Sequence, residues 1–222
     1  MPVRAANIRP HSVVDGPGAR TAVFFQGCVH RCKGCHSHAL WPFDGGVEVT
    51  VGEVLCEIGH GLAEGDVGVT LTGGDPLCQP EAAAALCVAL KGAGVHTIMY
   101  TGFVYEDLLE IETVIPAIGQ VLDAADVLVD GPYVQGLDDG SLPYRGSTNQ
   151  RIIDLPATRR DGQVVTLNWP PAVSILPDGS VVIPTVLEKS LKELGPSQPA
   201  RACGQESRPF GCESNQMDEP NN

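Results

Sequence analysis

The chain has 222 residues, of which 43% are apolar, so it can bury the core of one domain or of one domain with a tail. It carries 27 Asp and Glu against 14 Lys and Arg, which gives a formal charge of −13. Such a surface repels nucleic-acid phosphates and anionic membranes, so neither is an expected partner.

The first ten residues contain no apolar segment like that of a secretory signal. The longest apolar run, Ala82–Leu90, is too short to span a bilayer. We therefore expect a cytoplasmic protein, in which thiols stay reduced. Under that condition the eight cysteines point first to metal binding or catalysis rather than to disulfides.

Strand patterns alternate with helix patterns along most of the chain. Runs rich in β-branched and aromatic residues predict strands over Thr21–Phe25, Val67–Leu71, His96–Thr101, Val127–Val129 and Arg151–Leu155. Apolar residues at helical spacing predict helices over Val54–Leu62, Pro80–Leu90 and Tyr105–Ala125. A capping box of Thr50 and Glu53 precedes the first helix, and the last is expected to break before Pro116.

The alternation favours parallel βαβ units, whose right-handed crossovers place the C-terminal ends of the strands at one edge of the sheet. Ligand sites in such sheets gather at that edge. Four strand ends are predicted to meet there: Gly27-Cys28, Gly73-Gly74-Asp75, Thr101-Gly102 and Asp130-Gly131. Because glycines let backbone approach a ligand closely, we expect the binding site among these segments.

The pattern changes after Leu155. Val173–Leu176 and Val181–Ile183 flank a Pro-Asp-Gly-Ser turn and predict a β-hairpin, and a capping box at Thr185 begins a short helix to about Leu194. Pro, Ser, Gln, Asn and Gly dominate from residue 195 onward. We therefore predict one domain over residues 1–194, ending in the hairpin and helix, and a disordered tail over residues 195–222.

Three cysteines, Cys28, Cys32 and Cys35, fall within one loop directly after the first predicted strand. A structural zinc site needs four ligands, and three nearby histidines keep zinc open as an alternative: His30, His36 and His38. A cubane iron–sulfur cluster held by three cysteines instead leaves one iron open to a substrate or cofactor.

The other cysteines lie outside this loop. Cys56 and Cys87 fall on apolar helix faces and are expected to be buried, and Cys78 is expected to be structural. Cys203 and Cys212 lie in the predicted tail, and we do not expect them to bind a metal.

The CxxxCxxC motif, directly after Phe24-Phe25-Gln26-Gly27, resembles the radical S-adenosylmethionine (SAM) superfamily. The segment Asp15–Arg20, together with Cys35-His36 and Trp41, narrows the resemblance to activases of glycyl-radical enzymes. Further motifs are similar to activases of anaerobic ribonucleotide reductases: Leu71–Leu77, Tyr100–Gly102, Val129–Gly131 and Tyr144–Ile152. The run Arg145–Gln150 matches that branch better than the pyruvate formate-lyase branch, and the resemblance covers roughly Ile8 to Asp154.

The resemblance implies an α/β fold of the partial (β/α) barrel type, with the β-hairpin as a C-terminal extension. It implies one 4Fe–4S cluster on Cys28, Cys32 and Cys35, with SAM chelating the fourth iron. The contacts to SAM that it implies come from Gly34, Cys35, His36, Gly73, Gly74, Asp75 and Asp130, with Thr101 a weaker candidate. A positive ammonium group suits the carboxylate of Asp75. Ser37 departs from the pattern, which usually has Asn after Cys-His.

The implied reaction begins when a flavodoxin- or ferredoxin-type donor reduces the cluster. SAM is then cleaved to methionine and a 5′-deoxyadenosyl radical, which removes a Cα hydrogen from a glycine of the partner enzyme. The closest implied partner is an anaerobic ribonucleotide reductase. Three alternatives stay open: a radical SAM enzyme acting on a small molecule or peptide, another activase of the pyruvate formate-lyase type, and a zinc-bound structural module.

Asp15 and Arg20 have two interpretations. Within the family, the Asp-Gly-Pro-Gly segment lies near the entry of the target peptide. The same residues also fit a tight turn with a surface ion pair.

Overall fold

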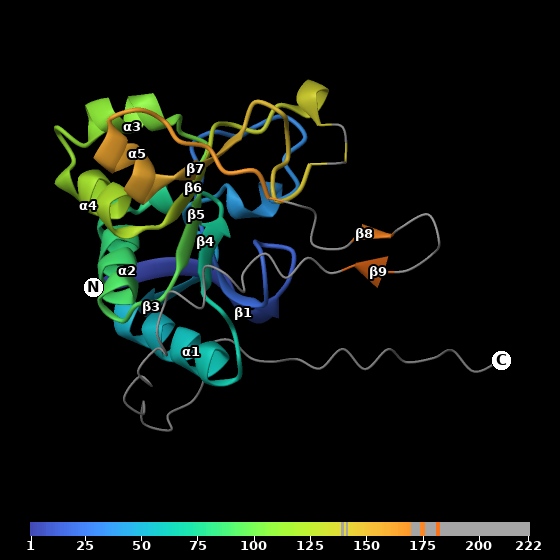
Figure 1. The fold of residues 1–222 in the computed structure, drawn as a ribbon. Helices are drawn as coiled ribbons and strands as arrows, with labels where there is room; N and C mark the ends of the chain where they lie inside the picture. Colours follow the sequence, from blue (N-terminus) through green and yellow to red (C-terminus); the bar gives the residue numbers. More distant parts are fainter. Residues whose placement is uncertain (139, 141, 170–173, 176–180, 183–222) are drawn as a thin grey trace.

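The computed structural model describes residues 1–138, 140, 142–169, 174–175 and 181–182 (Figure 1). Its centre is a seven-stranded mixed sheet in the order β3-β1-β2-β4-β5-β6-β7. The strands are β1 (Pro2–Ser12), β2 (Arg20–Phe25), β3 (Val47–Thr50), β4 (Val69–Gly73), β5 (Thr97–Tyr100), β6 (Val127–Asp130) and β7 (Arg151–Asp154). The mixed helix and strand content confirms the predicted α/β class.

The four central strands β2, β4, β5 and β6 run parallel, as predicted. Thr21 lies opposite Val69 and Phe25 opposite Gly73 in the first of these pairs. Because all four strands point the same way, their C-terminal ends meet at one edge of the sheet. The four strand ends predicted from the sequence to form the binding site are therefore brought together.

The outer strands run antiparallel. The N-terminal strand β1 pairs antiparallel with both β2 and β3, and none of the sequence patterns predicts β1 or β3. At the other edge β7 pairs antiparallel with β6, so the expectation of parallel pairing is wrong for this strand. The described part of the connection 131–150 contains one short 3₁₀ turn, Gln135–Leu137, whereas a parallel pair needs a longer crossover, usually an α-helix.

Five helices accompany the sheet in the described residues: α1 (Val51–Ala63), α2 (Pro80–Gly92), α3 (Tyr105–Ile111), α4 (Pro116–Ala124) and α5 (Leu155–Asp161). The predicted capping box is confirmed, because Glu53 N donates to Thr50 Oγ1 over 3.2 Å and Thr50 N donates to the Glu53 carboxylate over 2.6 Å. The predicted break before Pro116 separates α3 from α4. The last helix, α5, is not predicted.

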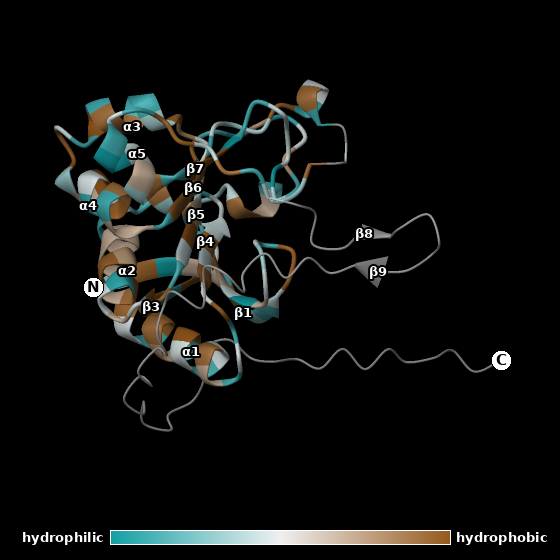
Figure 2. Cartoon of the chain, in the orientation of Figure 1, coloured by the Kyte–Doolittle hydropathy of each residue, from teal (hydrophilic) through white to brown (hydrophobic). Residues whose placement is uncertain are grey.

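The core lies between the sheet and the helices, which line one side of it (Figure 1). Side chains alternate across each strand, so Met99 and Leu128 pack into this core. Ile98 and Val129 point to the opposite face and form a smaller cluster with the partly buried Trp169. Figure 2 shows brown, hydrophobic residues in the sheet and teal, hydrophilic ones on the outward faces of α3 and α5.

The C-terminal part is described only in two short strands. β8 (Ser174–Ile175) and β9 (Val181–Val182) pair antiparallel within the predicted hairpin. The predicted helix to Leu194 and the predicted tail over 195–222 lie outside the described residues. Within the described part of the chain, no helix has both the length and the apolar character needed to cross a bilayer.

Candidate functional site

The three cysteines lie in a loop, residues 28–35, which we call the cysteine loop. It leaves the end of β2 and is closed at its base, because Gly27 N donates to Leu40 O over 2.8 Å and Cys28 N donates to Trp41 O over 3.1 Å. Two left-handed residues turn the chain between the cysteines, Arg31 with φ +49° and Gly34 with φ +80°. The backbone thus holds the loop in place by hydrogen bonds of its own.

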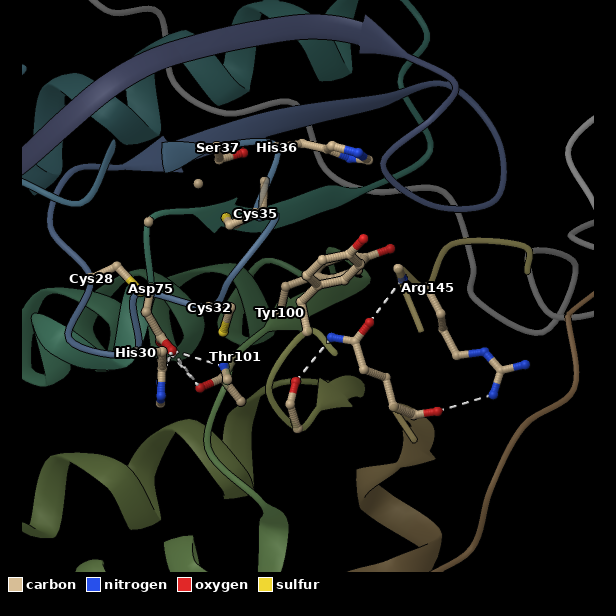
Figure 3. Close-up of a pocket in the computed structure, with 18 of the residues that line it drawn as sticks. Cys28, His30, Cys32, Cys35, His36, Ser37, Asp75, Tyr100, Thr101 and Arg145 are labelled. Carbon is tan, nitrogen blue, oxygen red and sulfur yellow. Dashed lines mark hydrogen bonds and ion pairs between the residues drawn. The ribbon is translucent and has the colours of Figure 1, made fainter. Parts of the chain in front are cut away.

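A pocket of about 450 Å³ opens at the C-terminal ends of the parallel strands (Figure 3). Cys28, Cys32 and Cys35 all line it, so the structure brings the predicted cluster ligands to one cavity. The strand ends Gly73-Gly74-Asp75 and Thr101-Gly102 form a second wall. The pocket thus joins the two groups of residues that the sequence predicts to bind the cluster and SAM.

The cysteines fit a multi-iron cluster in their chemistry. The described residues contain no group of three or more His, Cys, Asp or Glu side chains that could together hold one metal ion. In a 4Fe–4S cluster each cysteine ligates its own iron, so the three thiolates need not converge on one point. Burial raises the pKa of the Cys28 thiol, and backbone hydrogen bonds from His30 and Arg31 oppose that shift.

The two strand-end glycines are required by close packing between β4 and β2. Gly73 has φ +107°, and a Cβ there would lie 2.5 Å from the backbone nitrogen of Phe25. A Cβ on Gly74 would lie 2.3 Å from the Gly27 carbonyl oxygen. Both glycines therefore let the end of β4 approach the base of the cysteine loop, and both line the pocket.

Asp75 has a buried carboxylate, 1% exposed, that accepts hydrogen bonds from four groups. Leu77 N donates to Oδ1 over 2.9 Å, and Gly102 N donates to Oδ2 over 2.9 Å. The Thr101 hydroxyl contacts Oδ1 at 3.1 Å and Oδ2 at 3.0 Å, and His30 Nε2 lies 2.8 Å from Oδ2. Because a carboxylate only accepts, His30 Nε2 is the donor in that pair.

The remaining predicted SAM contacts lie in different surroundings. His36 lines the pocket, whereas Gly34 is exposed on the cysteine loop and does not line it. The Asp130 carboxylate accepts from Tyr105 N over 2.8 Å and from Arg151 Nε over 3.1 Å, and it forms an ion pair with Arg151. Asp130 thus faces away from the pocket, to which its neighbour Gly131 contributes instead.

The expectation of a surface ion pair between Asp15 and Arg20 is wrong. Arg20 is fully buried, and its guanidinium donates to Thr70 Oγ1 over 3.0 Å and to Val69 O over 2.7 Å. This burial lowers the Arg20 pKa to about 10. Asp15 lines the pocket, and its backbone carbonyl accepts from Thr70 Oγ1 of β4 over 2.8 Å, so the turn packs against the sheet.

A third wall of the pocket comes from the connection between β6 and β7 and is missed by the sequence predictions of the site. Tyr133, Tyr144, Arg145 and Gln150 line it (Figure 3 labels Arg145). Gln150 Oε1 accepts from Gly146 N over 2.8 Å, and its Nε2 donates to the Gly131 carbonyl over 2.9 Å. The similarity of Tyr144–Ile152 to a family motif is the signal that could have identified this wall.

The cysteines outside the loop differ in burial. Cys87 is fully buried, as predicted, and burial raises its pKa to about 12. Cys78 is half-buried beside the Asp75 turn, where burial also raises its pKa to about 12. Cys56 is only partly buried, so the expectation of full burial is wrong there. Cys203 and Cys212 lie outside the described residues.

Comparison with known proteins agrees with this geometry. The model of a 4Fe–4S single cluster domain family matches residues 14–153, which include the cysteine loop and all three pocket walls. A single-cluster iron–sulfur protein is therefore the class that the fold and the site define.

Individual relatives narrow the class further. The anaerobic ribonucleoside-triphosphate reductase-activating proteins of Salmonella typhimurium and Escherichia coli K12 are 33% and 32% identical over 150 residues, or 64% of this chain and 93% of theirs. The pyruvate formate-lyase-activating enzyme of Clostridium pasteurianum is 37% identical over 144 residues, or 61% of this chain and 60% of that protein. The chain belongs to the radical SAM family of glycyl-radical-enzyme activases.

Proposed function

We propose that this protein activates an anaerobic ribonucleotide reductase by placing a glycyl radical on it. The observation that carries the proposal is the convergence of Cys28, Cys32 and Cys35 on one pocket at the ends of four parallel strands. The relatives from Salmonella typhimurium and Escherichia coli K12, which match this chain over 93% of their own length, are named for that activity.

In this proposal Cys28, Cys32 and Cys35 each ligate one iron of a 4Fe–4S cluster. The cluster, when bound with SAM, supplies the one-electron chemistry that generates a radical. The chain's own residues bind and orient. The base of the loop fixes the cysteines, and the glycine pair lets the end of β4 pack against that base while both glycines line the pocket. We propose contacts to SAM from predicted residues that line the pocket, Cys35, His36, Gly73 and Gly74, and from the end of β6 through Gly131.

We also propose that the sheet is the open, partial form of a (β/α) barrel. The helices that lie along one side of the parallel strands support this, as does the pocket at the strand ends (Figure 1). An incomplete barrel leaves one side of the site open. A large partner needs that opening, because the glycine that receives the radical is part of a polypeptide chain. A flavodoxin- or ferredoxin-type donor in the cytoplasm would supply the electron.

A second candidate partner is an enzyme of the pyruvate formate-lyase type. The relative from Clostridium pasteurianum supports it, although the match covers only 60% of that protein. The two candidates share the cluster and the use of SAM and differ in the protein that receives the radical.

The deciding experiment incubates the reduced protein with SAM and each partner enzyme under anaerobic conditions, with electron paramagnetic resonance as the readout. We expect a glycyl doublet on the reductase and 5′-deoxyadenosine in solution. Replacing the reductase's radical-bearing glycine with alanine should remove the doublet while the activase keeps its iron. A doublet on the lyase alone would select the second candidate. SAM cleavage with no radical on either enzyme would favour a small-molecule or peptide substrate.

A further inference from the structure

The Asp75 carboxylate has no acceptor site left for a ligand. An ionised carboxylate offers about four lone-pair sites. Four donors of the chain already approach them: the His30 ring, the Thr101 hydroxyl and the backbone N–H groups of Leu77 and Gly102. An ammonium group bound there would have to displace one of these donors in a site that is 1% exposed.

The four donors come from three segments that are far apart in the sequence. His30 belongs to the cysteine loop, Leu77 follows β4, and Thr101 and Gly102 follow β5. Figure 3 shows the dashed contacts from Asp75 to His30 and Thr101 beneath the cysteines. The carboxylate is therefore a junction between the loop and two strand ends.

The His30 ring is also held by packing. It lies edge-on to the Phe103 ring, with 4.5 Å between the ring centroids. A Cβ on Gly102 would lie 2.5 Å from the His30 ring, so the missing side chain at position 102 makes the space that the ring fills. His30 is thus fixed by one hydrogen bond and two neighbours.

We infer that Asp75 is a positioning residue, which fixes the cysteine loop to the ends of β4 and β5 through His30 and does not itself bind the ammonium group of SAM. The inference rests on the proposed function and deepens it. The effect of Asp75 on SAM is then indirect: the carboxylate sets where the cysteines lie, and the cluster that they hold sets where SAM binds.

The first experiment is a double-mutant cycle with Asp75→Asn and His30→Ala in the metal-free protein. If the two side chains act as one junction, their effects on the unfolding equilibrium constant are coupled by at least about twofold. The readout needs no cluster, so it stays valid even if the proposed function fails. Additive effects would overturn the junction.

A second pair of variants keeps the test independent of whether the Asp75 variants fold. Gly102→Ala should displace the His30 ring and reduce the iron bound after reconstitution. His30→Ala removes the clash, so adding Gly102→Ala to it should cause no further loss of iron. A further loss in the double variant would overturn the packing argument.

SAM affinity separates positioning from direct contact. Positioning predicts that Asp75→Asn and His30→Ala weaken SAM binding by similar factors at equal iron content, and that the double variant is no weaker than the worse single one. A direct ammonium contact predicts a loss of about 10- to 150-fold for Asp75→Asn alone, with His30→Ala unchanged, which would overturn the inference.

The chain offers a matched control at the other end of β4. Asp66 is a buried carboxylate that accepts from His11 Nδ1 over 2.8 Å and from the Thr21 hydroxyl over 2.6 Å. Asp66→Asn and His11→Ala should destabilise the fold but leave iron content and SAM affinity unchanged. An equal loss of iron and SAM affinity in the Asp66 variant would mean that Asp75 acts through general stability, which would overturn a specific positioning role.

Discussion

Cys28, Cys32 and Cys35 share a pocket wall, whereas Cys87 is enclosed by the core. Replacing any one of the three by alanine should abolish the cluster, since each is expected to hold a different iron. Iron and sulfide analysis with visible absorption after anaerobic reconstitution checks this. Cys87→Ala is the control: it should lower stability yet retain the brown colour. Normal iron content in Cys32→Ala would remove the assignment of the cluster to this loop.

Glycine at position 73 is a second residue-scale requirement. Gly73→Ala places a side chain at φ +107° and 2.5 Å from the Phe25 backbone, where neither strand can yield without breaking its pairing. We expect a loss of about 1–3 kcal/mol in the free energy of unfolding from backbone strain, with more from the overlap. Urea denaturation measures it.

Gly92 supplies the comparison for Gly73. It lies at the exposed end of α2, and a Cβ there would meet no atom within 4 Å. Gly92→Ala should therefore be neutral or stabilise by about 0.4–1 kcal/mol. Equal destabilisation at the two positions would argue against the close packing of β4 on β2.

At the scale of elements, His11 links the end of β1 to the segment before β4. Hydrogen bonds to the carboxylates of Asp66 and Glu64 raise the pKa of His11 above its usual 6.5. A raised folded-state pKa means that the link contributes fully below pH 6.5 and is lost as the pH rises through the folded value. The contribution of this link to the free energy of unfolding should therefore fall as the pH rises.

Urea unfolding of the wild type and of His11→Gln tests this link. The difference in their midpoints should be larger at about pH 5.5 than at about pH 8.5. His38→Gln, at an exposed histidine that has no carboxylate partner among the described residues, should show no such difference. A difference for His11→Gln that grows with pH would contradict the assignment.

The central elements could be predicted because their patterns are regular. The strands β2, β4, β5 and β6 are short apolar runs, α1 starts at a capping box, and α2 starts at a proline. The first strand, β1, is not predicted because it contains Pro2 and Pro10. Two irregularities in its pairing with β2 also interrupt the alternation of buried and exposed side chains. The start of α5 is not predicted because the predicted strand runs on to Leu155, whereas Asp154 both ends β7 and caps α5 by accepting from Ala157 N.

The site was predictable to the extent that strand ends determine it. Parallel strands collect their C-terminal ends, so Cys28, Gly73 and Thr101 could be expected at one edge. The wall formed by the connection 131–150 follows no periodicity, since it joins antiparallel strands through an irregular segment. The partners of Asp75 could not be predicted either, because its residue type suggests a ligand for a cation whereas the structure surrounds it with donors.

At the scale of the whole molecule, the formal charge of −13 governs encounters with other proteins. An acidic ferredoxin used as electron donor should be repelled, and salt screens that repulsion over a Debye length of about 10 Å at 0.1 M. We expect its rate of cluster reduction to rise between about 0.02 and about 0.2 M NaCl, as followed by stopped-flow absorbance.

Photoreduced deazariboflavin, a small neutral reductant, is the control for that rate and should show little salt dependence. A rate that instead falls with salt would mean that local attraction outweighs the net charge. Arg31 and Lys33, which are exposed beside Cys32, would then be the first residues to replace with acidic ones.

The cysteine loop is tied at its base by Gly27 and Cys28 and at its middle by His30, all through contacts that involve no metal. Small metal-dependent domains fold only when their ion arrives, and they collapse when it leaves. Because these contacts come from the chain itself, we expect the loop to keep its conformation when the cluster is lost. Oxygen damage would then remove the cluster from a polypeptide that keeps its fold, and such a protein should recover its iron on anaerobic reconstitution without being unfolded first.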